Sequence, residues 1–234
     1  LSDITDPIFL NKNVGPYTVA NALRNRGIKV TVIHHLNMWD LDDLISTVIH
    51  LVDENTLFVG FSNFFYKIVD QNSTETGEIK YLRSDKNILL PHGLEQGNQL
   101  AQAIKQKNSK CKIVLGGPKA LDTVNNKNID YIFKGYSDTT VIEFADFLIN
   151  QLPPSKSWIK NLYGITIIDG AGAESFDFVN TKMQWQPQDI ILPNETLPIE
   201  IARGCIFRCK FCSYPLNGKK KLDYIKSIEL LKEE

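Results

Sequence analysis

The sequence predicts an α/β fold in which residues 1–150 form a doubly wound, five-stranded parallel sheet. Short apolar runs alternate along the chain with segments in which apolar residues recur every three or four positions. This is the pattern of strands that alternate with helices, and it favours βαβ units. Glycine and proline stand between these segments, where turns are expected.

The individual strands are predicted from runs of apolar and β-branched residues. They cover residues 7–10, 28–33, 57–61, 112–115 and 129–133. Helical spacing predicts helices between and after them that end near residues 26, 52, 107 and 150, the first one entered through a turn at 13–16. Two further alternating segments predict a β-hairpin insertion at 66–71 and 78–83.

Proline-rich turns divide the remainder of the chain, beginning with QLPPS at 151–155. The expected parts are a first domain at 1–150, a linker at 151–196 with a second β-hairpin (163–169 with 175–179), and the start of another domain at 197–234. That last part has a predicted strand at 197–202 and a helix from about residue 223.

Composition and chain ends limit the class of protein. A net charge of −1 gives no general attraction to nucleic acid, and the longest apolar runs are far shorter than the ~18 residues that span a bilayer. No signal peptide opens the chain, so the cytoplasm is the expected location. Because the chain begins with Leu1 and its last helical pattern has no cap, we expect a piece of a longer protein.

Three of the four cysteines lie together as C-x3-C-x2-C, at Cys205, Cys209 and Cys212. Disulfides among such close neighbours would leave one thiol unpaired, so the spacing favours a metal. Structural zinc needs four ligands, and a fourth could come only from the distant Cys111 or a histidine such as His92.

Three thiolates also suit a 4Fe–4S cluster with one open iron. The cations that flank the cysteines, Arg203, Arg208 and Lys210, would lower the thiol pKa values and offset the charge of the cluster. Both metals stay open at this point, and the absence of a nearby fourth ligand favours the cluster.

These residues resemble the signature of the radical S-adenosylmethionine superfamily, C-x3-C-x-aromatic-C, which Cys205, Cys209, Phe211 and Cys212 match. The resemblance implies that the three cysteines hold a 4Fe–4S cluster, that S-adenosylmethionine chelates the open iron, and that Phe211 lies beside the adenine. It also implies that LPIEIARG is the first strand of a partial (β/α)6 barrel. Six βα units need roughly 190 residues, whereas fewer than forty follow Leu197.

The first domain resembles the cobalamin-binding domain that precedes many such barrels. The similar segments are GPYTVANALRNRGIKVTVI, LFVGFS, IVLGGPKA and IDYIFKGYSD, followed by E-x-x-R-G-C at 200–205. The resemblance places possible cobalamin contacts in the loops after the strands, at Gly15, Pro16, Ser62, Asn63, Gly116, Gly117, Gly135 and Tyr136. The pattern D-x-H-x-x-G is absent around His34 and His35, so cobalt ligation by histidine is not expected. A purely structural domain is the alternative.

The resemblance implies an enzyme that generates a 5′-deoxyadenosyl radical, with cobalamin taking part in methyl transfer or rearrangement at an unreactive carbon. It also implies a small-molecule or peptide substrate and an electron donor such as flavodoxin or ferredoxin. The alternative of another class is a cobalamin-binding or cluster-carrying module without catalysis of its own. Methylthio transfer would need additional cysteines, which this chain lacks.

Overall fold

The computed structural model describes residues 12, 14–34, 39–62, 94–117, 120–123, 127–153, 155, 158–160, 163–170, 178–193, 195–203 and 225–234. The chain divides into two compact units. Unit 1 comprises residues 1–34 and 171–234, and unit 2 comprises residues 35–170.

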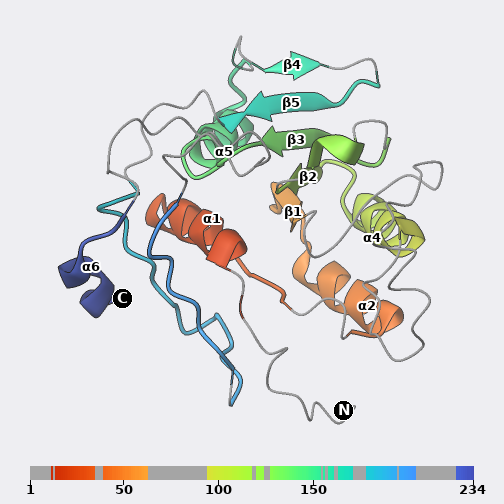
Figure 1. Ribbon diagram of the computed structural model, residues 1–234. Helices are drawn as coiled ribbons and strands as arrows, with labels where there is room; N and C mark the ends of the chain where they lie inside the picture. Colours follow the sequence, from red (N-terminus) through yellow and green to blue (C-terminus); the bar gives the residue numbers. More distant parts are fainter. Residues whose placement is uncertain are drawn as a thin grey trace. The chain divides into compact units, whose positions relative to one another are not determined.

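Unit 2 is built on one five-stranded sheet, as Figure 1 shows. Its strands are β1 (Phe58–Ser62), β2 (Lys112–Gly116), β3 (Tyr131–Lys134), β4 (Ile159–Lys160) and β5 (Thr166–Asp169). They lie in the order β1-β2-β3-β5-β4. The pairs β1–β2, β2–β3 and β3–β5 are parallel, and β4 runs antiparallel to β5. The predicted α/β class is therefore confirmed. The sheet has five strands and is mostly parallel, but β4 and β5 come from the predicted linker and not from residues 1–150.

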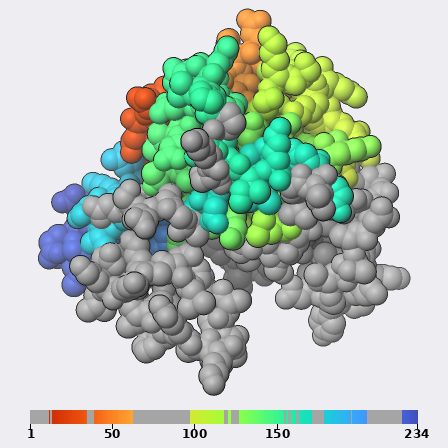
Figure 2. All heavy atoms as spheres, turned by 90° about the horizontal axis from the view of Figure 1, so that it is seen from above, coloured from red at the N-terminus to blue at the C-terminus, as the bar shows by residue number. Residues whose placement is uncertain are grey.

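Three long helices and one short turn of helix belong to the same unit: α2 (Leu41–Leu51), α4 (Leu94–Lys107), η3 (Ala120–Thr123) and α5 (Thr140–Asn150). Phe144 of α5 is fully buried and makes edge contacts with Phe58 of β1 and with Tyr131 and Phe133 of β3. Helix α5 therefore packs on the face of the sheet that carries these aromatic rings. Strand β4 forms one edge of the sheet, and both of its residues are exposed. The teal region that contains β4 and β5 lies at the surface in the view from above (Figure 2).

The strands of the structure match three of the five predicted ones, at 57–61, 112–115 and 129–133, within two residues at each end. The prediction for 28–33 is wrong, because residues 28–34 form no strand. The carbonyl oxygen of Val30 accepts a hydrogen bond from the guanidinium of Arg24, at 3.0 Å, instead of pairing in a ladder. A β-branched pattern shows that a segment suits a strand, but a neighbouring strand must be present to pair with it. The predicted strand at 7–10 and the hairpin at 66–83 lie outside the described residues.

The position of β5 differs from the predicted hairpin of 163–169 with 175–179. Strand β5 lies between β3 and β4, so both of its edges are paired. Its alternate residues Thr166 and Ile168 are buried, which suits a strand inside a sheet better than one in an exposed hairpin. The partner segment is only partly described, and residues 178–180 form a turn.

Strand order bears on where a ligand could bind. Doubly wound sheets bind ligands where the strand order reverses. Among the described strands, the parallel ones follow one another in sequence order without a reversal.

Unit 1 has little regular structure in its described part. It contains helix α1 (Val14–Asn25), the short helix α6 (Ile228–Glu233) and chain without regular helix or strand at 178–193 and 195–203. The expected turn at 13–16 is instead the first turn of α1, because the helix already begins at Val14. Proline is tolerated there, since the first turn has no N–H partner within the helix. Across the described residues no helix is long and apolar enough to cross a membrane.

Candidate functional site

The chain enters and leaves the cysteine segment, residues 204–224, at two points that are tied together in unit 1. Ala202 and Ile225 form an isolated antiparallel bridge. The backbone N–H of Lys226 donates to the carbonyl of Ile201 at 3.0 Å. The segment itself, with Cys205, Cys209, Phe211 and Cys212, lies outside the described residues. Its two ends nevertheless lie side by side, so the three cysteines belong to a closed loop.

An aromatic ring connects these two ends. The guanidinium of Arg203 lies 5.0 Å from the ring centroid of Phe178, and the ammonium of Lys226 lies 5.2 Å from it. All three residues are buried. Cations held this close to a ring face, away from water, gain about 2 kcal/mol each. We call Phe178, Arg203 and Lys226 the aromatic frame.

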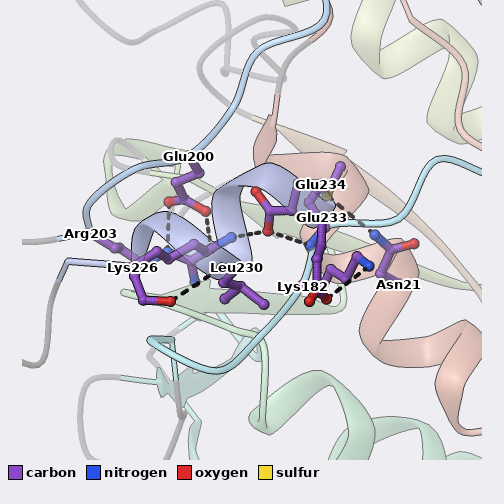
Figure 3. A network of polar contacts seen from close by, with 10 residues as sticks. Asn21, Lys182, Glu200, Arg203, Lys226, Leu230, Glu233 and Glu234 are labelled. Atoms are coloured by element: carbon purple, nitrogen blue, oxygen red, sulfur yellow. Dashed lines mark hydrogen bonds and ion pairs between the residues drawn. The ribbon is translucent and has the colours of Figure 1, made fainter.

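Each cation of the aromatic frame also has a carboxylate partner (Figure 3). Arg203 makes a two-pronged contact with Glu200, at 2.7 Å from Nε and 2.6 Å from Nη2. The ammonium of Lys226 donates to Oε1 of Glu234, which also accepts the backbone N–H of Met183 at 2.7 Å. Two cations and two carboxylates sum to zero charge. Arg203 therefore does not bring the uncompensated positive charge that its place beside the cysteines suggested.

A second candidate region is the carboxyl edge of the sheet in unit 2, where three of the predicted cobalamin loops begin. Ser62 and Gly116 are direct neighbours at the ends of β1 and β2. Within the part of the chain that the structure describes, a Cβ at Gly116 would meet no atom within 4 Å. Gly117 follows with a φ of 109°, a conformation that side chains other than glycine rarely adopt. The described residues thus leave the backbone at the end of β2 open to close approach.

The loop after β3, at Gly135 and Tyr136, is covered by the chain at Gly170. Gly135 has a φ of 79° after β3, and Tyr136 follows it. A Cβ on Gly170, at the end of β5, would lie 1.9 Å from the carbonyl oxygen of Tyr136. The chain at Gly170 therefore packs directly on the loop that was predicted to touch cobalamin. Sequence reasoning missed this role of Gly170, although its place after a strand is a signal for close backbone approach.

The predicted cobalamin residues do not all fall in one unit. Gly15 and Pro16 lie in helix α1 of unit 1. The residues at the strand ends lie in unit 2, and Asn63 is outside the described residues. The structure therefore brings Ser62 and Gly116 together directly and leaves the other contacts as predictions.

Two other candidate ligands, Cys111 and His34, are described by the structure, whereas His35 and His92 lie outside the described residues. Cys111 is fully buried beside β2, and burial raises the pKa of its thiol to about 11, so it is a core residue as expected. His34 is half-buried with its ring 5.9 Å from that of Tyr17. Among the described residues, no three histidine, cysteine, aspartate or glutamate side chains are grouped as metal ligands.

Comparisons with known proteins add no relative. A scan against models of protein families matched none of them, and searches of curated proteins and of solved structures found no match. The resemblance to the radical S-adenosylmethionine superfamily therefore rests on the motif residues themselves.

Proposed function

We propose that this protein is a radical S-adenosylmethionine enzyme with a cobalamin-binding domain ahead of a partial (β/α)6 barrel that starts near residue 197. The spacing of Cys205, Cys209 and Cys212 carries the proposal, because three close thiolates bind a 4Fe–4S cluster and leave one iron open. The tied ends of the cysteine segment support it, since ligands on a closed loop have less conformational freedom to lose on binding.

In this proposal the chain's own residues have distinct tasks. The three cysteine thiolates hold the cluster, and Phe211 packs beside the adenine of S-adenosylmethionine. The cluster supplies the electron that cleaves a C–S bond of S-adenosylmethionine to give the hydrogen-abstracting 5′-deoxyadenosyl radical. The protein places the cofactors and keeps side reactions out, as in cofactor enzymes generally. The cytoplasm, where thiols stay reduced, is the proposed setting, with flavodoxin or ferredoxin as electron donor.

Cobalamin is proposed to lie at the carboxyl edge of the sheet in unit 2. The support is the open backbone at Gly116 and Gly117 beside Ser62. Cobalamin would serve methyl transfer or rearrangement on a small-molecule or peptide substrate. Ligands of open parallel sheets bind outside the carboxyl ends of the strands, which is where Ser62 and Gly116 lie.

The cluster is tested by anaerobic reconstitution of the 234-residue chain with iron and sulfide. We expect about one 4Fe–4S cluster per chain. Alanine at Cys205, Cys209 or Cys212 should abolish it. Cys111→Ala is the matched control and should leave it intact, because this thiol is buried in unit 2. Stoichiometric zinc, with no cluster obtainable, would overturn the radical chemistry.

Cobalamin binding is tested by equilibrium dialysis of hydroxocobalamin. Gly116→Leu should weaken binding at least about tenfold, or 1.4 kcal/mol, by filling the open space. Gly60→Leu is the control, because Gly60 also has open space around its Cβ position but lies two residues before the end of β1. His34→Ala and His35→Ala should leave the spectrum of bound cobalamin unchanged. Equal binding by the two leucine variants would contradict the proposed location.

A further inference from the structure

We propose that Gly170 is a positioning residue at the carboxyl edge of the sheet in unit 2: it keeps the loop after β3 away from the ends of β1 and β2, where cobalamin binds. This inference rests on the proposed function, because it takes cobalamin as the ligand of this edge. It deepens that proposal by giving a role to β5, which follows the predicted first domain. All of the residues involved belong to unit 2.

The first step of the argument is that position 170 has no room for a side chain. A Cβ at Gly170 would lie 1.9 Å from the carbonyl oxygen of Tyr136 and 3.1 Å from that of Lys134. Both oxygens belong to the backbone, so neither can turn aside as the end of a side chain can. Because real Cβ contacts are not shorter than 3.0 Å, the shorter distance would have to grow by more than 1 Å. A side chain at position 170 therefore moves either the end of β5 or the loop after β3.

The second step is that the end of β5 is the more firmly held of the two. Strand β5 pairs with β3 on one side and with β4 on the other. Its last residue, Asp169, is in register with Lys134, and the ammonium of Lys134 lies 3.2 Å from a carboxylate oxygen of Asp169. Gly135 and Tyr136 belong to no strand or helix. The displacement consequently falls on these two residues.

The third step is the direction of this displacement, which follows from the order of the strands. Strand β3 lies between β5 and β2. A loop that leaves β3 and is pushed from the β5 side therefore moves toward the ends of β2 and β1. In the described part of the chain these ends are open, because a Cβ at Gly116 would meet no atom within 4 Å and Ser62 is its direct neighbour. Gly170 thus keeps free the space that a rigid corrin ring needs there.

The test is equilibrium dialysis of hydroxocobalamin against the 234-residue chain that carries Gly170→Ala. We expect the Kd to rise about tenfold, because the displaced loop enters the space of the ligand and overpacking has a cost of this size. Gly60→Ala is the matched control, since it adds the same methyl group in open space before the end of β1. Equal affinity of the two variants, both folded by circular dichroism, would overturn the inference.

A double-mutant cycle separates this role from a general loss of stability. Gly116→Leu and Gly170→Ala reduce the same space from two sides. Their combined effect on the Kd should therefore be smaller than the product of the two separate factors. Factors that simply multiply would show that Gly170 acts on the fold and not on the ligand site, and would also overturn the inference.

A second variant displaces the same loop if Gly170→Ala does not fold. Gly135 has a φ of 79°, so Gly135→Ala strains the loop from the β3 side. The matched control is Gly164→Ala, which introduces the same kind of strain at a φ of 83°, before the start of β5. Gly135→Ala should bind hydroxocobalamin more weakly than Gly164→Ala, and equal Kd values would contradict the proposed role of the loop.

Failure of this inference and failure of the proposed function give different results. Binding of hydroxocobalamin by the wild type that is insensitive to Gly170→Ala overturns the inference alone. A wild-type chain that binds no hydroxocobalamin overturns the cobalamin site and this inference together. The radical chemistry is tested separately, by assembly of the 4Fe–4S cluster.

Discussion

The two units bury different kinds of side chain. In unit 2 most buried side chains are apolar, and Phe144 lies among them with its ring 4.7 Å from that of Tyr131 and 5.3 Å from that of Phe58. In unit 1 charged side chains are buried as pairs. Arg24 contacts Asp189 through two hydrogen bonds of 2.7 Å, and their side chains are 9% and 0% exposed. The backbone groups of a sheet pair with one another, whereas buried backbone groups outside a sheet need other hydrogen-bond partners. Arg24 is such a partner, because its guanidinium also donates to the carbonyl of Val30.

Unit 1 contains further buried ion pairs of this kind. The ammonium of Lys12 lies 3.3 Å from a carboxylate oxygen of Glu195 and 3.2 Å from the hydroxyl of Tyr17, and these side chains are buried as well. The backbone of Lys12 is joined to that of Thr196. Ion pairs thus hold the N-terminal stretch and helix α1 to the extended chain that leads toward the cysteines. The difference teaches that the two units should respond differently to cavities, to charge removal and to acid.

The largest expected effect is a cavity in unit 2. Phe144→Ala should lower the free energy of unfolding of this unit by about 3–5 kcal/mol, because a fully buried ring is removed. ¹⁹F NMR of 5-fluorotryptophan protein can follow the units separately. Trp158 contacts Phe144 in unit 2, and Trp185 contacts Tyr17 in unit 1. The Trp158 signal should shift to lower denaturant, and an equal shift of both signals would contradict the comparison.

Removal of one charge should act on unit 1 by a smaller amount. Asp189→Asn should cost about 1.5–3 kcal/mol at neutral pH through loss of charge-assisted hydrogen bonds. Burial opposes ionisation of Asp189, but the side chain of Arg24 and the backbone N–H of Gln186 outweigh it and hold its pKa below the usual range. The Trp185 signal should report this loss.

The stability difference between wild type and Asp189→Asn should also depend on pH. Because the pKa of Asp189 is lower in the folded state, its stabilisation is complete above the unfolded value, near 3.8, and disappears as pH falls through the folded-state value. The difference in stability between wild type and Asp189→Asn should therefore shrink on acidification. A difference that stays constant from pH 6 to about pH 2 would show that folding does not lower the pKa of Asp189.

The smallest expected effect is at an exposed helix end of unit 2. The side chain of Asp40 accepts the backbone N–H of Asp42 at 2.9 Å and caps α2. Asp40→Ala should reduce the stability of unit 2 by about 1 kcal/mol. Urea titration followed at Trp158 measures the change. The control is Asp43→Ala, which removes a carboxylate from the first turn of the same helix but not the cap contact. A loss as large as that of Phe144→Ala would mean that exposed polar contacts, and not the apolar core, limit this unit.

Sequence patterns alone were enough to predict the strands that consist of buried apolar residues. Strands β1, β2 and β3 lie within two residues of the predicted segments 57–61, 112–115 and 129–133, and Cys111 is a core residue. Hydrophobic burial is non-directional, so an apolar run predicts a buried strand without knowledge of its neighbours. The spacing of the three cysteines likewise defines the proposed metal site without any contact in space.

Only the tertiary structure decided which segments pair. The run at 28–33 has strand-forming residues but no strand, and β5 joins β3 instead of closing a hairpin. Strand pairing depends on which neighbour is available, and that is set by the whole sheet. The contacts of unit 1 depend on direction and distance between residues far apart in sequence, such as Arg24 with Asp189 and Phe178 with Lys226. No local periodicity records such contacts, because a hydrogen bond or ion pair requires two particular atoms to meet in space.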